Sequence, residues 1–410
     1  MAAGLVPLRN GHVVQLLMGG QQYFPALIGA IDRATEEVWL ETYIFDFTAS
    51  GSEVAEALLR AARRGVATQL IVDGIGTARL PEPWPQRFDD AGVQWRVFSP
   101  LGRFGLLIPS RWRRLHRKLC VVDGRIAFCG GINILDDFHD PNHGTLTAPR
   151  FDFAVQASGP LVADMREAMV QLWRRMEAVR DVRQRQLAAA FTVLRSAGRL
   201  FGASGAAPLA PADDTQTPHV ARAALLLRDN LRNRSRIERA YRRAIGTARH
   251  EIIIANAYFL PGRKLRKALI LAAGRGVRVQ LLLQGKYEYF MQYHASRPVY
   301  GALLAAGVEI HEYAPSFLHA KVAVVDGRWA TVGSSNLDPL SLLLAREANV
   351  VVEDAEFATH LRDKLVHAMQ HQGQRIDPAR YASRPWGQRL RDRMAFGLMR
   401  MALFVTGHRY

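Results

Sequence analysis

A short pattern of histidine, lysine and aspartate occurs twice in this chain of 410 residues. His116, Lys118 and Asp123 form the first copy, and the second copy repeats the residues and their spacing as His319, Lys321 and Asp326. Asparagines follow at matching positions, Asn133 and Asn336. Duplicated units that bring matching groups to one site can supply an acid and a base that face each other. The repeat therefore predicts one two-part site with these six residues at its centre.

Each copy places an imidazole beside an ammonium group. Side chains alternate between faces along a β-strand, so a histidine and a lysine two residues apart are expected to share a face. A neutral imidazole can act as a nucleophile or base near pH 7, and a lysine can balance the charge of a phosphate oxygen. The pairs favour phosphoryl chemistry. Since no carboxylate and histidine cluster has metal-ligand spacing, neither a metal nor another cofactor is expected.

The aspartates of the two copies are expected to serve the scaffold. Asp123 and Asp326 lie an odd number of residues beyond the lysine, and each precedes a glycine, which predicts a turn at the end of a strand. Asp152 and Glu347 begin β-rich runs at matching places, and they are the carboxylates expected to orient the histidines. Candidate donors to phosphate oxygens are amide and hydroxyl side chains that follow the motifs: Asn133, Ser334 and Asn336.

The elements that must position these residues also repeat. In the first half a β-rich run, a helical pattern and a second strand are expected at 37–45, 53–64 and 67–72. In the second half the same order is expected at 251–259, 264–273 and 278–283. This alternation predicts the α/β class, with a mixed β-sheet flanked by helices in each half.

Composition divides the chain into four segments. The predicted limits are an N-terminal domain at 1–201 with its motif at 110–137, a linker at 202–217, a C-terminal domain at 218–383 with its motif at 313–340, and a basic tail at 384–410. The linker prediction depends on its content of glycine, proline and alanine. The tail combines arginines with large apolar side chains. It is either an amphipathic helix lying on a membrane or a terminal helix docked on the core with a solvated basic face.

The chain is strongly basic, with 54 Lys and Arg against 37 Asp and Glu and a formal net charge of +17. Such a surface attracts nucleic acid or the anionic face of a bilayer, and charge does not choose between them. No apolar stretch is long enough to span a membrane, and residues 1–20 do not resemble a signal peptide. The chain is therefore expected to be neither exported nor membrane-spanning.

The twin motif resembles the signature of the phospholipase D superfamily, a duplicated H-x-K-x4-D followed by a segment with Gly, Ser and Asn. Both copies match at His, Lys and Asp, and the one departure is Gly131, where many members carry Ser. Within the superfamily the chain is similar to bacterial cardiolipin synthases of the B type over most of its length, including Ala255–Phe259 and Val332–Leu340.

This resemblance implies two tandem phospholipase D-like domains, related by a pseudo-twofold axis, with the site at their interface. It also implies transfer of a phosphatidyl group between two phosphatidylglycerol molecules, giving cardiolipin and glycerol. His116 would be the nucleophile that forms a phosphohistidine, and His319 the general acid. The expected partner is anionic phospholipid at the cytoplasmic face of the bacterial cell membrane, with peripheral contact and no evident protein partner.

Two alternatives share the fold and the site. A hydrolytic phospholipase D differs only in using water instead of an alcohol to attack the intermediate. A nuclease of the same superfamily would cut nucleic acid phosphodiesters, and the charge of +17 would serve it equally well. The duplicated motif and the amphipathic tail favour lipid over nucleic acid.

Overall fold

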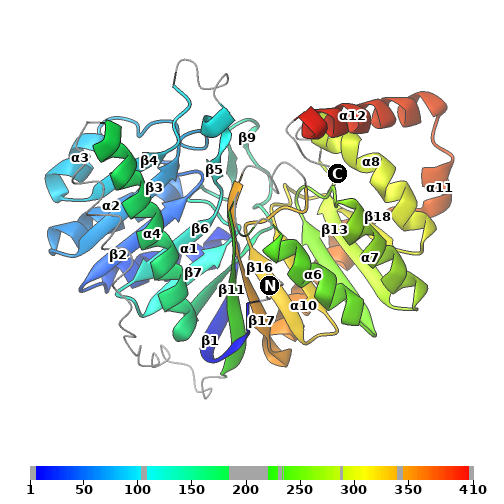
Figure 1. Ribbon diagram of the computed structural model, residues 1–410, viewed down its shortest axis with the longest axis horizontal. Coiled ribbons are helices and arrows are strands. Elements are labelled where there is room, and N and C mark those ends of the chain that lie inside the picture. Colours follow the sequence, from blue (N-terminus) through cyan, green and yellow to red (C-terminus); the bar gives the residue numbers. More distant parts are fainter. Residues whose placement is uncertain are drawn as a thin grey trace.

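The computed structural model describes residues 6–102, 109–183, 220–229, 233, 235–286, 290–338 and 345–405. The predicted linker at 202–217 lies outside these residues. Within them, 16 strands form one large mixed sheet that runs through both halves of the molecule, with helices on its faces. Figure 1 shows the halves side by side, blue to green on one side and green to red on the other. The predicted α/β class is confirmed.

The two halves repeat one strand order. The first half runs β1 (Arg9–Met18), β10 (Phe153–Ser158), β7 (Ile126–Gly130), β6 (Lys118–Val122), β2 (Glu37–Thr42), β3 (Ala67–Asp73) and β4 (Gln94–Phe98). The second runs β11 (Ala221–Arg228), β17 (Ala345–Glu353), β16 (Trp329–Gly333), β15 (Lys321–Val325), β12 (Glu251–Asn256), β13 (Arg278–Gln284) and β14 (Glu309–Tyr313), with β18 (Gly373–Arg375) at its edge. The equivalent strands β1 and β11 pair antiparallel and join the halves. Antiparallel pairing of equivalent strands is the arrangement that a pseudo-twofold axis produces.

The helices also correspond between halves. In the first half they are α1 (Gly19–Asp32), α2 (Ala49–Arg63), α3 (Trp84–Ala91) and α4 (Pro160–Arg183), and in the second α6 (Arg236–Thr247), α7 (Arg263–Gly274), α8 (Phe290–Ala305) and α10 (Ala355–His371). The second half adds α11 (Pro378–Ala382) and α12 (Trp386–Val405). Short elements complete the set: the 3-10 helix η2 (Pro109–Trp112) and strands β5 (Arg114–Leu115), β8 (His139–Asp140) and β9 (Gly144–Thr145).

The hydrophobic core has three parts. Helices α1 to α3 cover one face of the first half, and α6 to α8 cover one face of the second. A central cluster takes side chains from both halves, including Met165 and Met169 of α4 with Leu361 and Leu365 of α10. Full burial of each such side chain contributes about 1.5–3 kcal/mol, so the shared cluster holds the two halves together. In the described ranges, no helix has both the length and the apolarity needed to cross a membrane.

Local sequence accounts for the elements that flank the motifs. Apolar residues of α2 recur at helical spacing, and Val54, Leu58 and Ala61 are fully buried against the sheet. The strands β2 and β12 begin at the predicted residues, Glu37 and Glu251, but each ends three residues before its predicted limit. The residues beyond these ends form loops next to the motifs.

Candidate active site

The two motif histidines meet in a cavity between the halves. His116 follows β5, whose residues pair with the start of β17 in the other half, and its backbone N–H donates to the Arg346 carbonyl at 3.0 Å. His319 makes the equivalent bond to the Phe151 carbonyl at 2.9 Å. Both histidines line a cavity of about 620 Å³. Each half therefore reaches across the interface to place its histidine.

The orienting carboxylates are exchanged between the halves. His116 Nδ1 lies 3.1 Å from Glu347 Oε2, and His319 Nδ1 lies 2.7 Å from Asp152 Oδ2. These are the two carboxylates expected from the sequence, each paired with the histidine of the opposite half. A carboxylate at Nδ1 fixes the tautomer and the ring orientation and leaves Nε2 for chemistry. The contact exists only where both halves come together.

The histidines lie just before the strands rather than within them, which corrects the expectation from alternation. The strands begin at Lys118 and Lys321, because the chain must leave the sheet at each histidine to reach the other half. Each lysine curls back on its own motif: Lys118 Nζ donates to the His116 carbonyl at 2.7 Å, and Lys321 Nζ donates to the His319 carbonyl. Each lysine therefore contacts the backbone carbonyl of its motif histidine rather than the imidazole ring.

Both lysines are buried, and this concentrates positive charge beside the cavity. Burial lowers the pKa of Lys118 to about 7, with Lys321 adding to the effect and Glu347 opposing it. Burial also lowers the pKa of His116, although Glu347 opposes the shift. The pKa of His319 falls well below its ordinary value through burial and the charges of Lys321 and Lys118. An anion such as a phosphate would relieve this repulsion.

The two carboxylates differ in their electrostatics. Burial acts to raise the pKa of Glu347, but His116, Lys118 and a hydrogen bond from the Ser334 hydroxyl outweigh it and hold the pKa below its ordinary value. Burial raises the pKa of Asp152 to about 7, although Lys321 opposes the rise. Glu347 is therefore ionised near neutral pH, while the Asp152 carboxyl holds a proton for much of the time.

The two copies differ where Gly131 stands in place of Ser334, and each of these residues adjoins one of the two carboxylates. A Cβ atom at Gly131 would lie 2.7 Å from Oδ2 and 2.8 Å from Cγ of Asp152, so the carboxylate occupies the place of a side chain. Ser334 instead donates to Glu347. Its hydroxyl also contacts the Ala348 backbone, and the residue is fully buried. Ser334 therefore holds Glu347 in place, and its expected contact with a phosphate oxygen stays a prediction.

The motif aspartates lie away from the cavity, although the signature groups them with the catalytic residues. Asp123 follows the opposite end of β6 from Lys118, with a φ of 50°, and Asp326 is its equivalent after β15, with a φ of 52°. Asp123 accepts backbone hydrogen bonds from residues 35–37, and Asp326 from residues 249–251. These bonds hold the turn against the start of the neighbouring strand. This is the scaffold role expected from the odd spacing between the lysine and the aspartate.

The two asparagines line the cavity. Asn133 Oδ1 accepts from the Ile44 N–H at 3.2 Å. In the part of the chain that the structure describes, Asn336 Oδ1 is buried without a hydrogen-bond partner. Contact of either side chain with a phosphate oxygen stays a prediction.

Several lining residues were not singled out from the sequence. Tyr43 packs on His116 with ring centroids 5.0 Å apart, and Lys118 Nζ lies 5.5 Å from the Tyr43 ring centroid. Arg150 donates to Asp140 at 2.8 Å at the edge of the cavity. Next to this edge, His143 pairs with Asp140 and packs on Phe317. Tyr43 follows β2, and Tyr258 follows the equivalent strand β12. This matching position is the sequence signal that could have identified both tyrosines as lining residues.

Comparison with known proteins agrees with the repeat. A model of the family described as "Cardiolipin synthase, PLD-like domain" matches residues 27–147 and 241–369. Cardiolipin synthase B of Escherichia coli strain K12 is 36% identical over 96% of this chain and 89% of its own length. Cardiolipin synthase of Alkalihalophilus pseudofirmus is 27% identical over 94% of this chain and 72% of its own length.

The fold recurs in a solved structure, that of phosphatidylserine synthase from Haemophilus influenzae Rd KW20, with a TM-score of 0.62 and 12% identity over 90% of this chain and 89% of the other. The fold and the site define a protein with two phospholipase D-like domains. The chain belongs to the cardiolipin synthase family of such proteins.

Proposed function

We propose that this chain transfers a phosphatidyl group from one phosphatidylglycerol molecule to a hydroxyl of a second, giving cardiolipin and glycerol. The observation that carries the proposal is the pair of exchanged histidine–carboxylate contacts at one cavity, His116 with Glu347 and His319 with Asp152. Likeness to cardiolipin synthases supports the choice of substrate.

The first step forms a phosphohistidine on His116. Ionised Glu347 accepts a hydrogen bond from Nδ1–H of His116, which leaves a lone pair on Nε2. This nitrogen attacks phosphorus, so a P–N bond forms as the bond from phosphorus to the glycerol headgroup oxygen breaks. The buried ammonium groups of Lys118 and Lys321 balance the charge that develops on the phosphate oxygens.

His319 supplies the proton for the leaving glycerol. A protonated Asp152 carboxyl donates to Nδ1 of neutral His319, which places a proton on Nε2 at the cavity. That proton passes to the departing oxygen as the Asp152 proton moves to Nδ1, which leaves His319 neutral and Asp152 ionised. In the second step Nε2 of His319 takes the proton of the incoming phosphatidylglycerol hydroxyl while the Nδ1 proton returns to Asp152, and the hydroxyl oxygen bonds to phosphorus as the P–N bond breaks. The difference in pKa between the carboxylates thus supports opposite tautomers for the two histidines.

We place the reaction at the cytoplasmic face of the bacterial cell membrane, with peripheral contact. The net charge of +17 favours an anionic lipid surface, where both substrate molecules reside.

The test is product analysis by mass spectrometry after incubating the purified chain with phosphatidylglycerol vesicles. We expect cardiolipin and glycerol in equal amounts, no product from His116→Ala or His319→Ala, and a phosphatidyl adduct on the peptide that contains His116 after a denaturing quench at mildly alkaline pH, because acid hydrolyses the P–N bond. Phosphatidic acid as the main product would instead mean a hydrolase. Unchanged lipid together with cleavage of single- or double-stranded DNA would mean a nuclease.

A further inference from the structure

Helix α12 is an integral part of the second half. Asp392, Ala395 and Met399 form its buried face, and Met399 joins the core beneath α8. Asp392 pairs with His294 Nδ1 of α8 at 2.8 Å and with Arg384 at 3.1 Å. The docked helix predicted as one alternative for the tail is therefore present over the described part of α12.

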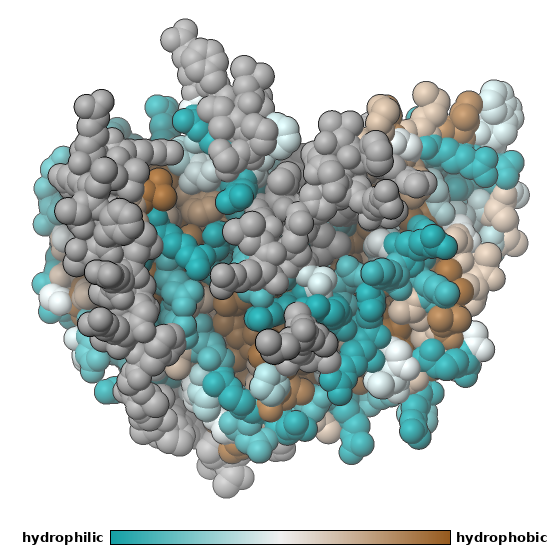
Figure 2. All heavy atoms as spheres, viewed as in Figure 1, coloured by the Kyte–Doolittle hydropathy of each residue, from teal (hydrophilic) through white to brown (hydrophobic). Residues whose placement is uncertain are grey.

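The opposite face of α12 is apolar and exposed. Its side chains recur every three or four residues and lie between 49% and 74% exposed: Trp386, Leu390, Met394, Leu398 and Met401. That spacing places them along one line of the helix. Figure 2 shows brown and tan side chains at the upper edge of the molecule over α12, next to teal ones. A line of large exposed apolar groups of this kind marks an interaction surface.

Arginines flank this apolar line. Arg389 and Arg393 follow one of its edges and Arg391 the other, and all three are exposed. The sequence of α12 contains a single acidic residue, Asp392, and it is buried. An apolar line between cationic borders fits the boundary between acyl chains and anionic headgroups. Pairing with a second copy of the helix would bring arginines against arginines.

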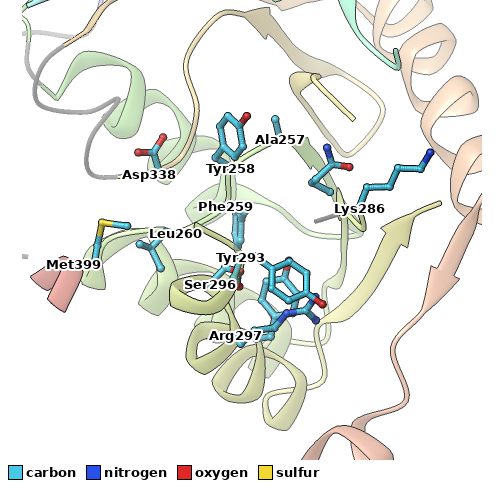
Figure 3. Close-up of a pocket in the computed structure, with 12 residues that line it drawn as sticks. Ala257, Tyr258, Phe259, Leu260, Lys286, Tyr293, Ser296, Arg297, Asp338 and Met399 are labelled. Carbon is cyan, nitrogen blue, oxygen red and sulfur yellow. Dashed lines mark hydrogen bonds between the residues drawn. The ribbon is translucent and has the colours of Figure 1, made fainter. Parts of the chain in front are cut away.

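The helix also adjoins the cavity through a second, smaller pocket. Tyr258 and Asp338 line both spaces, and Met399 of α12 lines the second pocket together with Leu260 (Figure 3). In Figure 1, α12 and β5, the strand that leads to His116, lie at the same end of the molecule. A surface that touches α12 thus lies at the end where the catalytic histidines are held.

We propose that α12 docks this protein on an anionic bilayer, with its apolar line among the headgroups and its arginines against lipid phosphates. The part of this inference that concerns catalysis rests on the proposed function: docking brings the cavity to the surface that holds its phosphatidylglycerol.

The binding test is sedimentation of the full chain with vesicles that contain phosphatidylglycerol or phosphatidylcholine alone. The variant Leu390→Gln/Met394→Gln/Leu398→Gln removes the centre of the line. A matched control changes exposed apolar residues elsewhere, Val179→Gln/Val220→Gln/Leu271→Gln. We expect the partition coefficient on anionic vesicles to fall at least about tenfold for the first variant and to stay unchanged for the control.

Turnover provides a second, separate measurement. With short-chain phosphatidylglycerol below its micelle concentration, the α12 variant should match the wild type, whereas on vesicles it should lose activity in parallel with binding. If the wild type turns over neither form, the proposed function fails, and the vesicle-binding comparison still decides the role of α12. Equal vesicle binding by the variant and the wild type would overturn the proposal. So would a wild-type dimer that the variant converts to a monomer without loss of vesicle binding, because the occupant would then be a second copy.

Discussion

Gly131→Ala should impair catalysis through a residue that touches no substrate. The added Cβ would lie 2.7 Å from Asp152 Oδ2 and closer still to Oδ1, whereas ordinary contact begins at 3.4 Å, so the carboxylate must move by about 1 Å. The hydrogen bond from Asp152 to His319, now 2.7 Å, would stretch beyond the normal range. Misplacement of about 1 Å at a catalytic group lowers kcat on the order of 100-fold, equivalent to about 3 kcal/mol of activation free energy.

The assay is cardiolipin formation from phosphatidylglycerol, with kcat and the thermal midpoint measured on the same preparation. Gly274→Ala is the matched control, because a Cβ there meets no atom within 4 Å, and its kcat should equal that of the wild type. The same glycine change is then made in an Asp152→Ala background, where the space is empty. No further loss is expected there, since both changes act on one contact.

Two results would refute this reasoning. Wild-type kcat in Gly131→Ala would mean that the carboxylate has room to move without releasing His319. If Gly131→Ala lowered kcat by the same factor with and without the Asp152 carboxylate, Gly131 would act through some other contact.

Three further predictions concern the carboxylates. Glu347→Gln keeps the shape but removes the charge at His116, and kcat should fall by about 10³- to 10⁴-fold in the same product assay; a loss below about tenfold would contradict orientation by charge. Because the pKa of Asp152 is raised to about 7, its carboxyl loses the proton as pH rises through that value, and kcat/KM should decline above about pH 7. Lys118, whose pKa is also lowered to about 7, loses its charge over the same range, so Asp152→Asn should show a shallower decline than the wild type, and superimposable pH profiles would exclude Asp152 as a source of the decline. Asp123→Ala removes hydrogen bonds to the start of β2 and should lower the free energy of unfolding by about 1–3 kcal/mol in a urea titration, with kcat within about threefold. A large loss of kcat at unchanged stability would give Asp123 a catalytic role instead.

The local features of the fold could be predicted from the sequence, because they depend on periodicity and turn residues. The strands that begin at Glu37 and Glu251 follow from β-rich runs, and the scaffold contacts of Asp123 and Asp326 follow from side-chain parity. The expectation that each histidine and lysine share one strand face failed, because the chain leaves the sheet at the histidine to pair with the other half. A local sequence pattern contains no information about that contact between segments far apart in the chain.

The sequence predicts which residues form the site better than it predicts which of them pair with each other. Asp152 and Glu347 were identifiable by type and position, but their exchange between the halves depends on β5 pairing with β17 and on Phe151 pairing with Leu318. Those bridges join segments far apart in the chain. The exposed line on α12 likewise depends on which helix face docks against α8, and the basic, apolar sequence of the tail was compatible with either outcome.

The exchange of carboxylates has a consequence for the history of the chain. A single unit would carry a histidine without the carboxylate that orients it, so a one-copy ancestor could act only as a pair of identical subunits. Every substitution in such a pair appears at both histidines at once. Fusion removed that restriction, and the glycine beside Asp152 and the serine beside Glu347 are differences that only a fused chain could acquire independently.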